Sequence, residues 1–321
     1  MNKGATLWIL PVGIVLLIIM IPVLTNLSKP KPLGKIDKNV QIELLSLPDD
    51  GVKKLPLNEY LVGVVAGEMP AAFDPEALKA QAIAARTYTL YRLNRTTDDK
   101  HPGRICNQPA HCQEYVTQGE LKKRWGSHYN FYLEKIQAAI QATDGLVITY
   151  DDQLIEPVYH ASCGGVGTES AAQVWGNDKP WLQSVECPEK EQLERDQVRK
   201  VTYSKKVVLD RLSAMMSVPV TTKSSEGAWK ISETTDTGRV QKISLGGIDI
   251  SGTELRRSLS LRSTVFTIEV QGDRVTFITR GYGHGVGLCQ EGSNLMALEG
   301  KTYQDILGHY YQGMKLMQIK K

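Results

Sequence analysis

The sequence lacks the motifs of several large protein classes. It contains no G-x-S-x-G, no H-E-x-x-H and no phosphate-binding P-loop, which excludes the common serine hydrolases, zinc peptidases and nucleotide hydrolases. It has no dense Lys/Arg block interleaved with aromatic residues, and its net charge is only +3, so a nucleic-acid-binding surface is not indicated. No repeat and no low-complexity tract is found. The 321 residues suffice for one large domain or two ordinary ones.

One long apolar run stands near the N-terminus. Residues 5–24, ATLWILPVGIVLLIIMIPVL, carry no charge and have about the length that spans a bilayer. No Ala-x-Ala cleavage site follows, which favours a retained anchor over a removed signal peptide. Residues 25–38 are rich in Pro, Lys and Gly and predict a tether. Lysines are more numerous after the run than before it, which weakly favours a cytoplasmic C-terminal domain, although long domains are translocated against that bias.

Cysteine usage does not settle the compartment. The chain has five cysteines, so at least one thiol has no internal disulfide partner. Cys163 and Cys187 could pair with each other and leave Cys289 free, and nothing in the sequence determines that pairing.

A compact His/Cys cluster lies in HPGRICNQPAHC, residues 101–112. His101, Cys106, His111 and Cys112 supply two imidazoles and two thiols, a full tetrahedral set for a structural zinc ion. The alternative is a disulfide between Cys106 and Cys112, which is plausible outside the cytoplasm. The spacing is not one of the common finger patterns.

A single carboxylate, Glu68, is the first candidate for a catalytic residue. Leu61, Val64, Val65 and Glu68 recur at i, i+3, i+4 and i+7, so one helical face carries three aliphatic side chains and then an acid. A carboxyl group held against aliphatic neighbours is disfavoured as an anion, which raises its pKa and keeps it protonated near neutral pH, as a general acid requires. The alternative is an ordinary surface glutamate at a helix C-terminus.

The elements around Glu68 predict an α+β fold, a membrane-anchored catalytic domain of mixed helices and antiparallel strands. Gly67 and Pro70 are expected to end the first helix, and Asp74 and Pro75 provide the N-cap and first turn of an alanine-rich helix over residues 76–92. Further strands are expected at 40–47, 146–150 and 154–162, hairpins at 238–250 and 264–280, a charged helix or excursion at 189–199, a capping box at 251–254, and helices at 131–143, 202–216, 290–298 and 302–311.

Two glycine-containing turns are candidate walls of a site. Residues 162–165, Ser-Cys-Gly-Gly, predict a tight turn where backbone can approach a ligand closely. His284 lies among the glycines of residues 281–287, whose spacing does not match a dinucleotide fingerprint and instead indicates a loop with unusual backbone angles. A histidine between glycines has little packing from its neighbours, which favours a site role. Trp175 and Trp181 could stack on sugar rings, although covering the core is the commoner role.

These segments resemble the stage II sporulation protein D family, peptidoglycan lytic transglycosylases of endospore-forming bacteria. The resemblance covers essentially the whole chain and rests on the N-terminal anchor, GEMPAAFDPEALKAQAIAARTYTLY, YHASCGG and RGYGHGVGLCQEGSNLMALEGKTYQDILGHYYQG. Three motifs of this length in one order argue strongly against chance similarity. Cys163 and Cys289 stand where relatives often have serine.

The resemblance implies that Glu68 is the catalytic glutamate. Protonated Glu68 would donate to the glycosidic oxygen between N-acetylmuramic acid and N-acetylglucosamine, and would then take the proton of the muramic 6-hydroxyl as it attacks the anomeric carbon, leaving a 1,6-anhydro end. One acid/base carboxylate is enough for this reaction, whereas a glycoside hydrolase usually needs two, and no obvious second acid stands in the matching motifs. The residues expected to bind the glycan or orient Glu68 are Arg86, Tyr159, Ser162, His284 and Gln290. For Arg86, a structural salt bridge is the alternative.

The resemblance also implies a metal, a location and partners. Some relatives carry zinc near the glutamate, and the cluster at residues 101–112 is the corresponding place. An anchor at 1–27 would lie in the mother-cell membrane, followed by a linker at 28–38 and an extracytoplasmic transglycosylase domain at 39–321, with a subdomain at 189–275, facing the forespore. The expected partners are stage II sporulation proteins M and P, the latter an amidase that strips stem peptides and leaves denuded glycan.

Two other functions remain open from the sequence. The chain could be a glycan-binding module that stimulates an amidase without cleaving sugar, as related amidase-enhancer proteins suggest. It could also be a hydrolytic muramidase. The products formed from denuded glycan separate the three, because only a transglycosylase leaves anhydromuramic ends.

Overall fold

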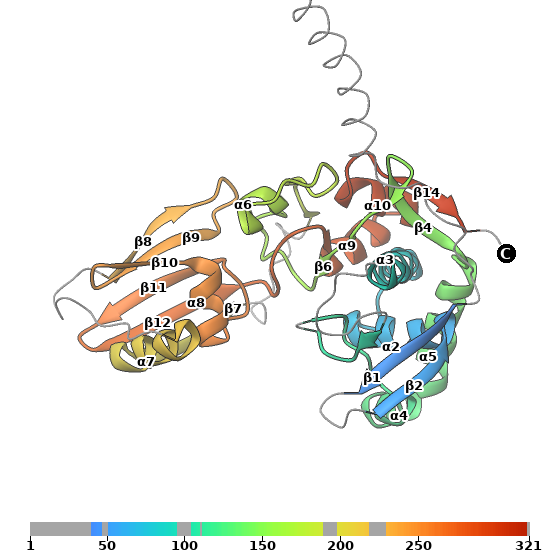
Figure 1. Cartoon of the computed structure of the whole chain (residues 1–321), viewed down its shortest axis with the longest axis horizontal. Coiled ribbons are helices and arrows are strands. Elements are labelled where there is room, and N and C mark those ends of the chain that lie inside the picture. Colours follow the sequence, from blue (N-terminus) through green and yellow to red (C-terminus); the bar gives the residue numbers. More distant parts are fainter. Residues whose placement is uncertain are drawn as a thin grey trace, which may run out of the picture.

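The computed structural model describes residues 40–46, 51–94, 104–109, 111–188, 198–217 and 229–319. The predicted anchor and linker lie outside these ranges, as does His101. Among the helices that the structure does describe, none has both the length and the apolar character of a membrane span. The described part contains mixed helices and mainly antiparallel strands, as the α+β prediction requires (Figure 1).

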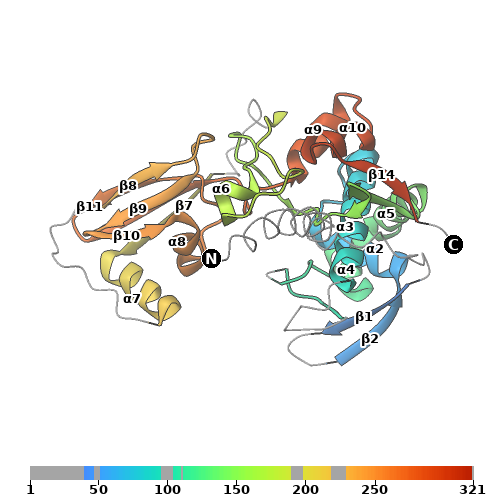
Figure 2. The same ribbon diagram turned by 45° about the horizontal axis from the view of Figure 1, so that its top comes forward.

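The first core is built from the N- and C-terminal parts of the chain, which lie together in Figures 1 and 2. Its N-terminal elements are β1 (Gln41–Ser46), β2 (Gly51–Pro56), α2 (Leu57–Glu68), α3 (Pro75–Leu93), β3 (Ile105–Cys106), α4 (Gln118–Trp125), α5 (Tyr129–Ala142), β4 (Leu146–Tyr150), β5 (Gln153–Leu154), β6 (Tyr159–His160) and α6 (Ala171–Trp175). Its C-terminal elements are β13 (Leu288–Cys289), α9 (Gln290–Leu298), α10 (Tyr303–Tyr310) and β14 (Lys315–Gln318).

Helix α3 is the centre of this core. Its alanine-rich sequence lets α2, α5, α9, α10 and β4 pack closely around it, and all of its alanines are fully buried. The Asp74 side chain caps the helix by accepting a hydrogen bond from the backbone N–H of Glu76, as the sequence predicts. The Asp74 N–H donates to the side chain of Asn294 in α9, which ties the start of α3 to the C-terminal motif.

Strands β4 and β6 join the two ends of the chain. β14 pairs antiparallel with β4, and β13 pairs parallel with β6. The single strand expected at 154–162 is two short strands instead, because Pro157 interrupts the backbone donors between them. The pairing of β13 with β6 brings the YHASCGG segment beside the start of α9.

A second hydrophobic core belongs to the segment between residues 198 and 280, the sheet-rich part at the left of Figure 1. Two three-stranded sheets, in the orders β10-β9-β8 and β11-β12-β7, contribute to it together with two helices. The elements are β7 (Val198–Ser204), α7 (Lys205–Met216), β8 (Trp229–Thr234), β9 (Val240–Leu245), β10 (Ile248–Ser251), α8 (Gly252–Leu259), β11 (Phe266–Gln271) and β12 (Arg274–Arg280).

Both predicted hairpins and the capping box are confirmed in this second core. β9 and β10 pair across Gly246 and Gly247, β11 pairs with β12, and the Ser251 side chain caps α8 in a capping box with Glu254. The helix expected at 202–216 is partly wrong, because residues up to Ser204 form strand β7 along β12. Arg199 and Lys200 near the start of β7 obscured the alternation of apolar and polar residues that would have predicted a strand.

The two cores are joined by direct polar contacts. The Arg239 guanidinium donates to the backbone oxygens of Gly167 (2.8 Å) and Cys163 (3.3 Å), and its side chain is buried. The Thr237 hydroxyl donates to the Glu169 carboxylate at 2.6 Å. Charge-assisted hydrogen bonds between buried groups are among the stronger polar contacts in proteins, so these pairs hold the sheet-rich part against the 162–169 turn.

Candidate functional site

Glu68 is the last residue of α2. Leu61, Val64 and Val65 are fully buried on the helical face that leads to it, as the periodicity predicts. Full burial of each such side chain contributes roughly 1.5–3 kcal/mol, so this face holds the helix end firmly in place. Met69 then takes extended backbone angles and the helix stops.

The segment 113–116 lies directly on α2 at two glycines. A Cβ atom added to Gly63 would collide with the Tyr115 ring, and one added to Gly67 would come within 3.0 Å of the Glu114 backbone oxygen. The prediction that Gly67 ends the helix is therefore wrong. Gly67 lies inside α2, where the absence of a side chain lets the segment approach.

This approach gives Glu68 a hydrogen-bond partner. The backbone N–H of Glu114 donates to Glu68 Oε1 at 2.6 Å. The carboxyl group is only partly exposed, and burial raises its pKa to about 7, with the Glu114 N–H opposing the rise and the Glu114 charge adding to it. At neutral pH, protonated and ionised Glu68 are both populated, as a group that donates and then accepts a proton requires.

A cavity of about 490 Å³ opens beside Glu68, and we call it the Glu68 cavity. One part of its wall is the end of α2 and the segment after it, residues 66–73. The other lining residues are Arg124, Trp125, Tyr132, Ala161, Gln290 and Glu291. The rings of Trp125 and Tyr132 meet edge to face at 5.7 Å, and such amphipathic rings present an apolar face with a polar edge. The cavity thus combines an acid of raised pKa with surfaces suited to a sugar.

Two charged residues of this cavity were not among the sequence candidates. Arg124 donates to the backbone oxygen of Ala66 at 3.2 Å and pairs with the Glu114 carboxylate at 3.5 Å. Glu291 lies in the C-terminal motif, in the first turn of α9, and lines the same cavity as Glu68. The expectation that the matching motifs hold no second acid near Glu68 is therefore wrong, because the chain brings α9 to the end of α2.

Two predicted site residues lie at or near Glu68. Gln290 lines the cavity and donates to the side chain of Gln81 in α3 at 3.3 Å. The Tyr159 hydroxyl donates to the Gln113 side chain at 2.7 Å, one residue before Glu114. Burial raises the pKa of Tyr159, and the nearby Glu68 charge adds to the rise, so Tyr159 is a neutral hydrogen-bond donor behind the acid.

Arg86 lies elsewhere. Its side chain is fully buried, and its guanidinium donates to the backbone oxygens of Ile140, Thr143 and Leu146, at 2.8 to 3.2 Å. These carbonyl groups belong to the last turn of α5 and to residues that follow it. They accept no hydrogen bond within the helix. Arg86 therefore joins α3 to the α5–β4 connection, and a sugar in the Glu68 cavity would not reach it.

His284 and Ser162 organise the turns beside the cavity. The backbone N–H of Val286 donates to His284 Nδ1 at 3.1 Å, and the same ring bonds to the backbone of Tyr159. Burial lowers the pKa of His284 to about 4, so the ring is neutral at pH 7. Ser162 exchanges two backbone hydrogen bonds with Tyr282. Positive φ angles at the glycines of residues 281–287 confirm the predicted loop geometry.

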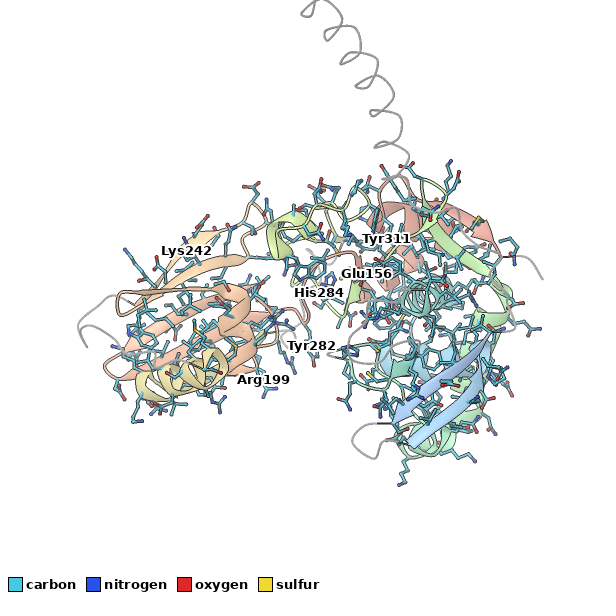
Figure 3. The ribbon with its side chains drawn as sticks, viewed as in Figure 1. Glu156, Arg199, Lys242, Tyr282, His284 and Tyr311 are labelled. Atoms are coloured by element: carbon cyan, nitrogen blue, oxygen red, sulfur yellow. The ribbon has the colours of Figure 1, made fainter. Side chains whose placement is uncertain are left out.

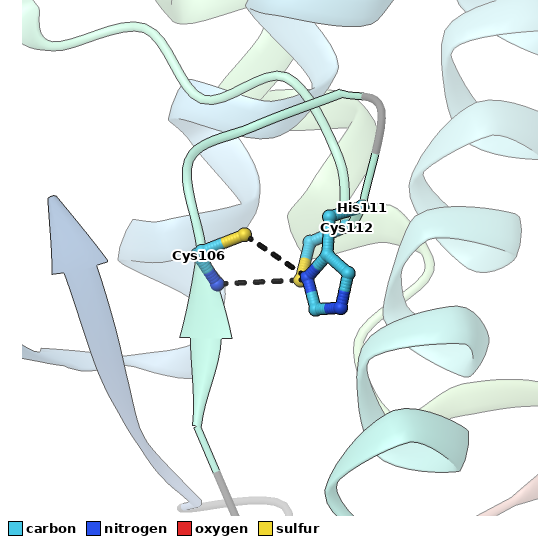
Figure 4. Close-up of side chains that lie close together, drawn as sticks. All are labelled: Cys106, His111 and Cys112. Atoms are coloured by element: carbon cyan, nitrogen blue, oxygen red, sulfur yellow. Dashed lines mark hydrogen bonds between the residues drawn. The ribbon is translucent and has the colours of Figure 1, made fainter. Parts of the chain in front are cut away.

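The cysteines and histidine expected to bind zinc lie together as far as the structure describes them. Cys106 Sγ and Cys112 Sγ each lie 3.3 Å from His111 Nδ1. Figure 4 shows the three side chains together. Their potential ligand atoms all fall within 4.8 Å of one another, a separation compatible with one tetrahedral ion. Cys112 stands two residues before Glu114. A bond or ion that restrained Cys112 would therefore also restrain the segment whose Glu114 N–H binds Glu68.

The remaining cysteines form a second group. Cys163, Cys187 and Cys289 are buried, with sulfur atoms within 4.8 Å of one another. No disulfide joins these three cysteines in the described part of the chain, and the Cys289 sulfur caps α9 by accepting a hydrogen bond from the N–H of Gly292. Which two would pair stays undecided, because every pairing is within reach.

Aromatic spacing could have identified the aromatic wall of the Glu68 cavity. Trp125, Tyr129 and Tyr132 follow one another at helical intervals, and Trp125 contacts both tyrosines. No comparable signal marks Glu291 or Arg124, because a single charged residue on a helix is usually a solvated surface group.

Comparisons with known proteins agree with these motifs. A family model described as a stage II sporulation protein matches residues 50–150. The chain is 35% identical over 294 residues to stage II sporulation protein D of Bacillus subtilis (strain 168), an alignment that covers 90% of this chain and 83% of that protein. It is 34% identical over 281 residues to the protein of the same name from Bacillus amyloliquefaciens, covering 87% and 79%. An amidase enhancer of Bacillus subtilis (strain 168) is 28% identical over 314 residues, covering 80% of this chain and 40% of that protein.

Proposed function

Because the chain belongs to the stage II sporulation protein D family, a family of sporulation proteins, we propose that it is a peptidoglycan lytic transglycosylase. Its substrate would be the bond between N-acetylmuramic acid and N-acetylglucosamine in denuded glycan strands. The observation that carries the proposal is Glu68, an acid with a pKa of about 7 at the wall of a cavity lined by Trp125 and Tyr132.

The proposed reaction needs one proton carrier. Protonated Glu68 donates to the glycosidic oxygen as the bond to the anomeric carbon breaks. The resulting carboxylate takes the proton of the muramic 6-hydroxyl while its oxygen bonds to that carbon. Glu68 ends protonated, no water is consumed, and a 1,6-anhydro end is formed. A pKa of about 7 suits both transfers, because the best acid–base groups titrate near the working pH.

The surrounding residues would hold Glu68 and the sugar. The Glu114 N–H fixes one carboxyl oxygen of Glu68 and leaves the other for the reacting proton. Gln290 can donate or accept hydrogen bonds with sugar hydroxyls in the cavity. Tyr159, Ser162 and His284 act through the segments they hold rather than by contact with the sugar.

A structural zinc ion is part of the proposal. Cys106, His111 and Cys112 fit as ligands, and His101 is the predicted fourth ligand, outside the described residues. Bound there, the metal would hold the 106–112 loop and, through it, the position of the Glu114 N–H. Metal analysis of protein purified without chelator tests this. Absence of zinc together with a disulfide between Cys106 and Cys112 would contradict it.

We base the proposed location and partners on the resemblance to the same family. The apolar run at residues 5–24 would anchor the chain in the mother-cell membrane, with the domain facing the forespore. Stage II sporulation proteins P and M would be its partners, the former supplying the denuded strands. Fractionation of sporulating cells, with protease protection of the domain, tests the orientation.

Product analysis tests the activity. Purified protein is incubated with denuded glycan strands, and the products are identified by mass spectrometry. We expect anhydromuramic ends from the native chain and none from Glu68→Gln. Cleavage by Glu68→Gln at the native rate would contradict the proposed role of Glu68.

Two rival functions each have one observation in their favour. Glu291 supplies a second carboxyl group in the cavity, as a hydrolytic muramidase would require. The similarity to a protein named amidase enhancer favours a glycan-binding module that stimulates an amidase. Reducing ends with the mass of added water would identify the hydrolase. Uncleaved strands together with faster amidase turnover would identify the enhancer.

A further inference from the structure

A second cavity lies on the sheet-rich part of the molecule. Its volume is about 550 Å³, and we call it the arginine pocket. Strand β7, helices α7 and α8, and the loop after α8 each contribute to it. Its five arginines are Arg199, Arg211, Arg256, Arg257 and Arg262.

The arginine pocket is strongly positive. No Asp or Glu is among the described residues that line it. Burial lowers the pKa of Arg256, the nearby Tyr282 opposes this shift, and the charges of Arg257 and Arg239 lower the pKa further. Guanidinium groups gathered in this way repel one another, and an anionic ligand would relieve that repulsion.

The rim of the arginine pocket carries an aromatic ring. The Tyr282 side chain is 56% exposed, although it belongs to the glycine loop of the C-terminal motif. The Arg262 guanidinium lies 5.7 Å from the centre of the ring. Figure 3 shows Tyr282 and Arg199 on the side of the sheet-rich part that faces the helical core. An exposed ring beside guanidinium groups suits a ligand with both sugar rings and negative charge.

A short path joins this rim to the Glu68 cavity. Ala161 lines the Glu68 cavity, and its neighbour Ser162 exchanges backbone hydrogen bonds of 3.0 and 2.9 Å with Tyr282. One chain step and one antiparallel bridge place the Cα atoms of Ala161 and Tyr282 at most about 9 Å apart. A ligand longer than a few sugars could therefore contact both cavities.

We propose that the arginine pocket binds carboxylate groups of an anionic glycan strand whose other sugars occupy the Glu68 cavity. This inference rests on the proposed function and adds to it a means of choosing the substrate. In a denuded strand, the lactyl group of each muramic sugar ends in a free carboxylate. In a strand that carries peptides, the same group is a neutral amide. Arginine recognises carboxylates through paired hydrogen bonds and gains no such pair from an amide, so the pocket distinguishes the two strands.

Binding measurements on a non-cleaving protein test this. Glu68→Gln protein is titrated calorimetrically with a muramic-acid-containing oligosaccharide that has free lactyl carboxylates, and with the same oligosaccharide after conversion of its carboxylates to methylamides. We expect the free acid to bind at least about tenfold more tightly at low salt, and the difference to shrink as salt is raised. Equal binding of the two would overturn the proposal.

Matched variants localise the effect. Arg199 and Arg274 are both exposed and stand at opposite ends of the β7–β12 ladder, opposite Thr279 and Ser204 respectively. In the Glu68→Gln background, adding Arg199→Ala and Arg257→Ala should abolish the preference for the free acid, whereas adding Arg274→Ala should leave it intact. Retention of the preference in the Arg199/Arg257 variant would overturn the proposal, as would its loss in the Arg274 variant.

Titration with phosphate compounds tests whether the arginine pocket binds carboxylate or phosphate groups. Inorganic phosphate and polyphosphate are titrated into the same protein. Weak binding of both, beside tight binding of the free-acid glycan, supports the carboxylate site. Polyphosphate that binds more tightly than the glycan, and is released by Arg199→Ala with Arg257→Ala, would identify a phosphate-polymer site instead. None of these readouts needs cleavage, so a chain without transglycosylase activity can still pass or fail them.

Discussion

The Glu68 cavity and the arginine pocket are nearly equal in volume, about 490 and 550 Å³, and opposite in chemistry. The first has two glutamates and one arginine among its lining residues and lies at the junction of helices. The second has five arginines and no described acid, and lies on strands β7 and β12 and helices α7 and α8. A carboxyl group must be shielded from positive charge to keep a proton at pH 7, whereas an anion-binding surface needs that charge. If both proposals hold, their location in different cores gives the acid and the anion-binding surface separate electrostatic environments.

The largest expected effect is at Glu68. Replacing it with glutamine removes the proton carrier while keeping size and hydrogen-bonding capacity, so cleavage should fall by roughly 100- to 10,000-fold. The rate of anhydromuramic-end formation from denuded strands measures it. Glu291→Gln is the comparison within the same cavity, and its products should keep their anhydro ends. Hydrated ends or complete loss of cleavage in that variant would assign Glu291 a part in the chemistry.

The same substitution should raise stability at alkaline pH. The folded-state pKa of Glu68, about 7, lies above the ordinary value of 4.5 for a glutamate, so folding favours the protonated form. That contribution is fully present below pH 4.5 and is lost as pH rises through 7. At pH 8, Glu68→Gln should therefore increase the free energy of unfolding by about 3 kcal/mol at most. Urea unfolding of both proteins at pH 4 and pH 8 measures the change, and a gain that is larger at pH 4 would contradict the raised pKa.

Substitutions in the arginine pocket should change substrate affinity rather than the rate of the chemical step. Arg199→Ala with Arg257→Ala should lower kcat/KM on denuded strands by about ten- to a hundredfold, because each lost charged hydrogen bond weakens binding, while kcat at saturating substrate stays close to native. Steady-state kinetics separates the two constants. A fall in kcat with KM unchanged would place these arginines in the reaction itself.

The pH profile should distinguish the two cavities. With a pKa of about 7, the protonated fraction of Glu68 is roughly tenfold lower at pH 8 than at pH 6, and the rate of the acid-requiring step should fall with it. Arginines stay charged throughout this range, so the affinity of the arginine pocket should change little. Measuring substrate affinity and turnover in the same buffers gives the pH dependence of each. A parallel decline of the two would contradict the assignment of binding and proton transfer to separate cavities.

The smallest effect is expected at Gly67. A Cβ atom there would come within 3.0 Å of the Glu114 backbone oxygen, so Gly67→Ala should displace the segment that donates to Glu68. We expect cleavage to fall a few-fold and the kinetic pKa of Glu68 to shift, because both the burial of the carboxyl group and its hydrogen bond from the Glu114 N–H would change. Gly119→Ala, whose added Cβ meets only ordinary contact distance at Thr117, is the matched control and should behave as native. An unchanged pH profile in Gly67→Ala would show that this approach does not control the acid.

The sequence predicted local features better than long-range ones. The apolar face that leads to Glu68, the Asp74 cap, both hairpins and the glycine loop depend on neighbours within a few residues, and all are present. Gly67 was misread because a glycine in a helix has two explanations, an end or a close approach, and only the packing of residues 113–116 decides between them. Arg86 was misread for the same reason, since a buried arginine that binds carbonyls has the same local sequence as one that faces a ligand.

By itself, the sequence determined the secondary structure around the acid and the family of the chain, because both are properties of contiguous residues. Only the tertiary structure decided what surrounds the acid. It brought Glu291 and Gln290 to the end of α2, aligned the Glu114 N–H with Glu68, and gathered five arginines from scattered positions into one pocket. The physical reason is that proton affinity and anion binding depend on distance and burial, which arise when separate segments pack together.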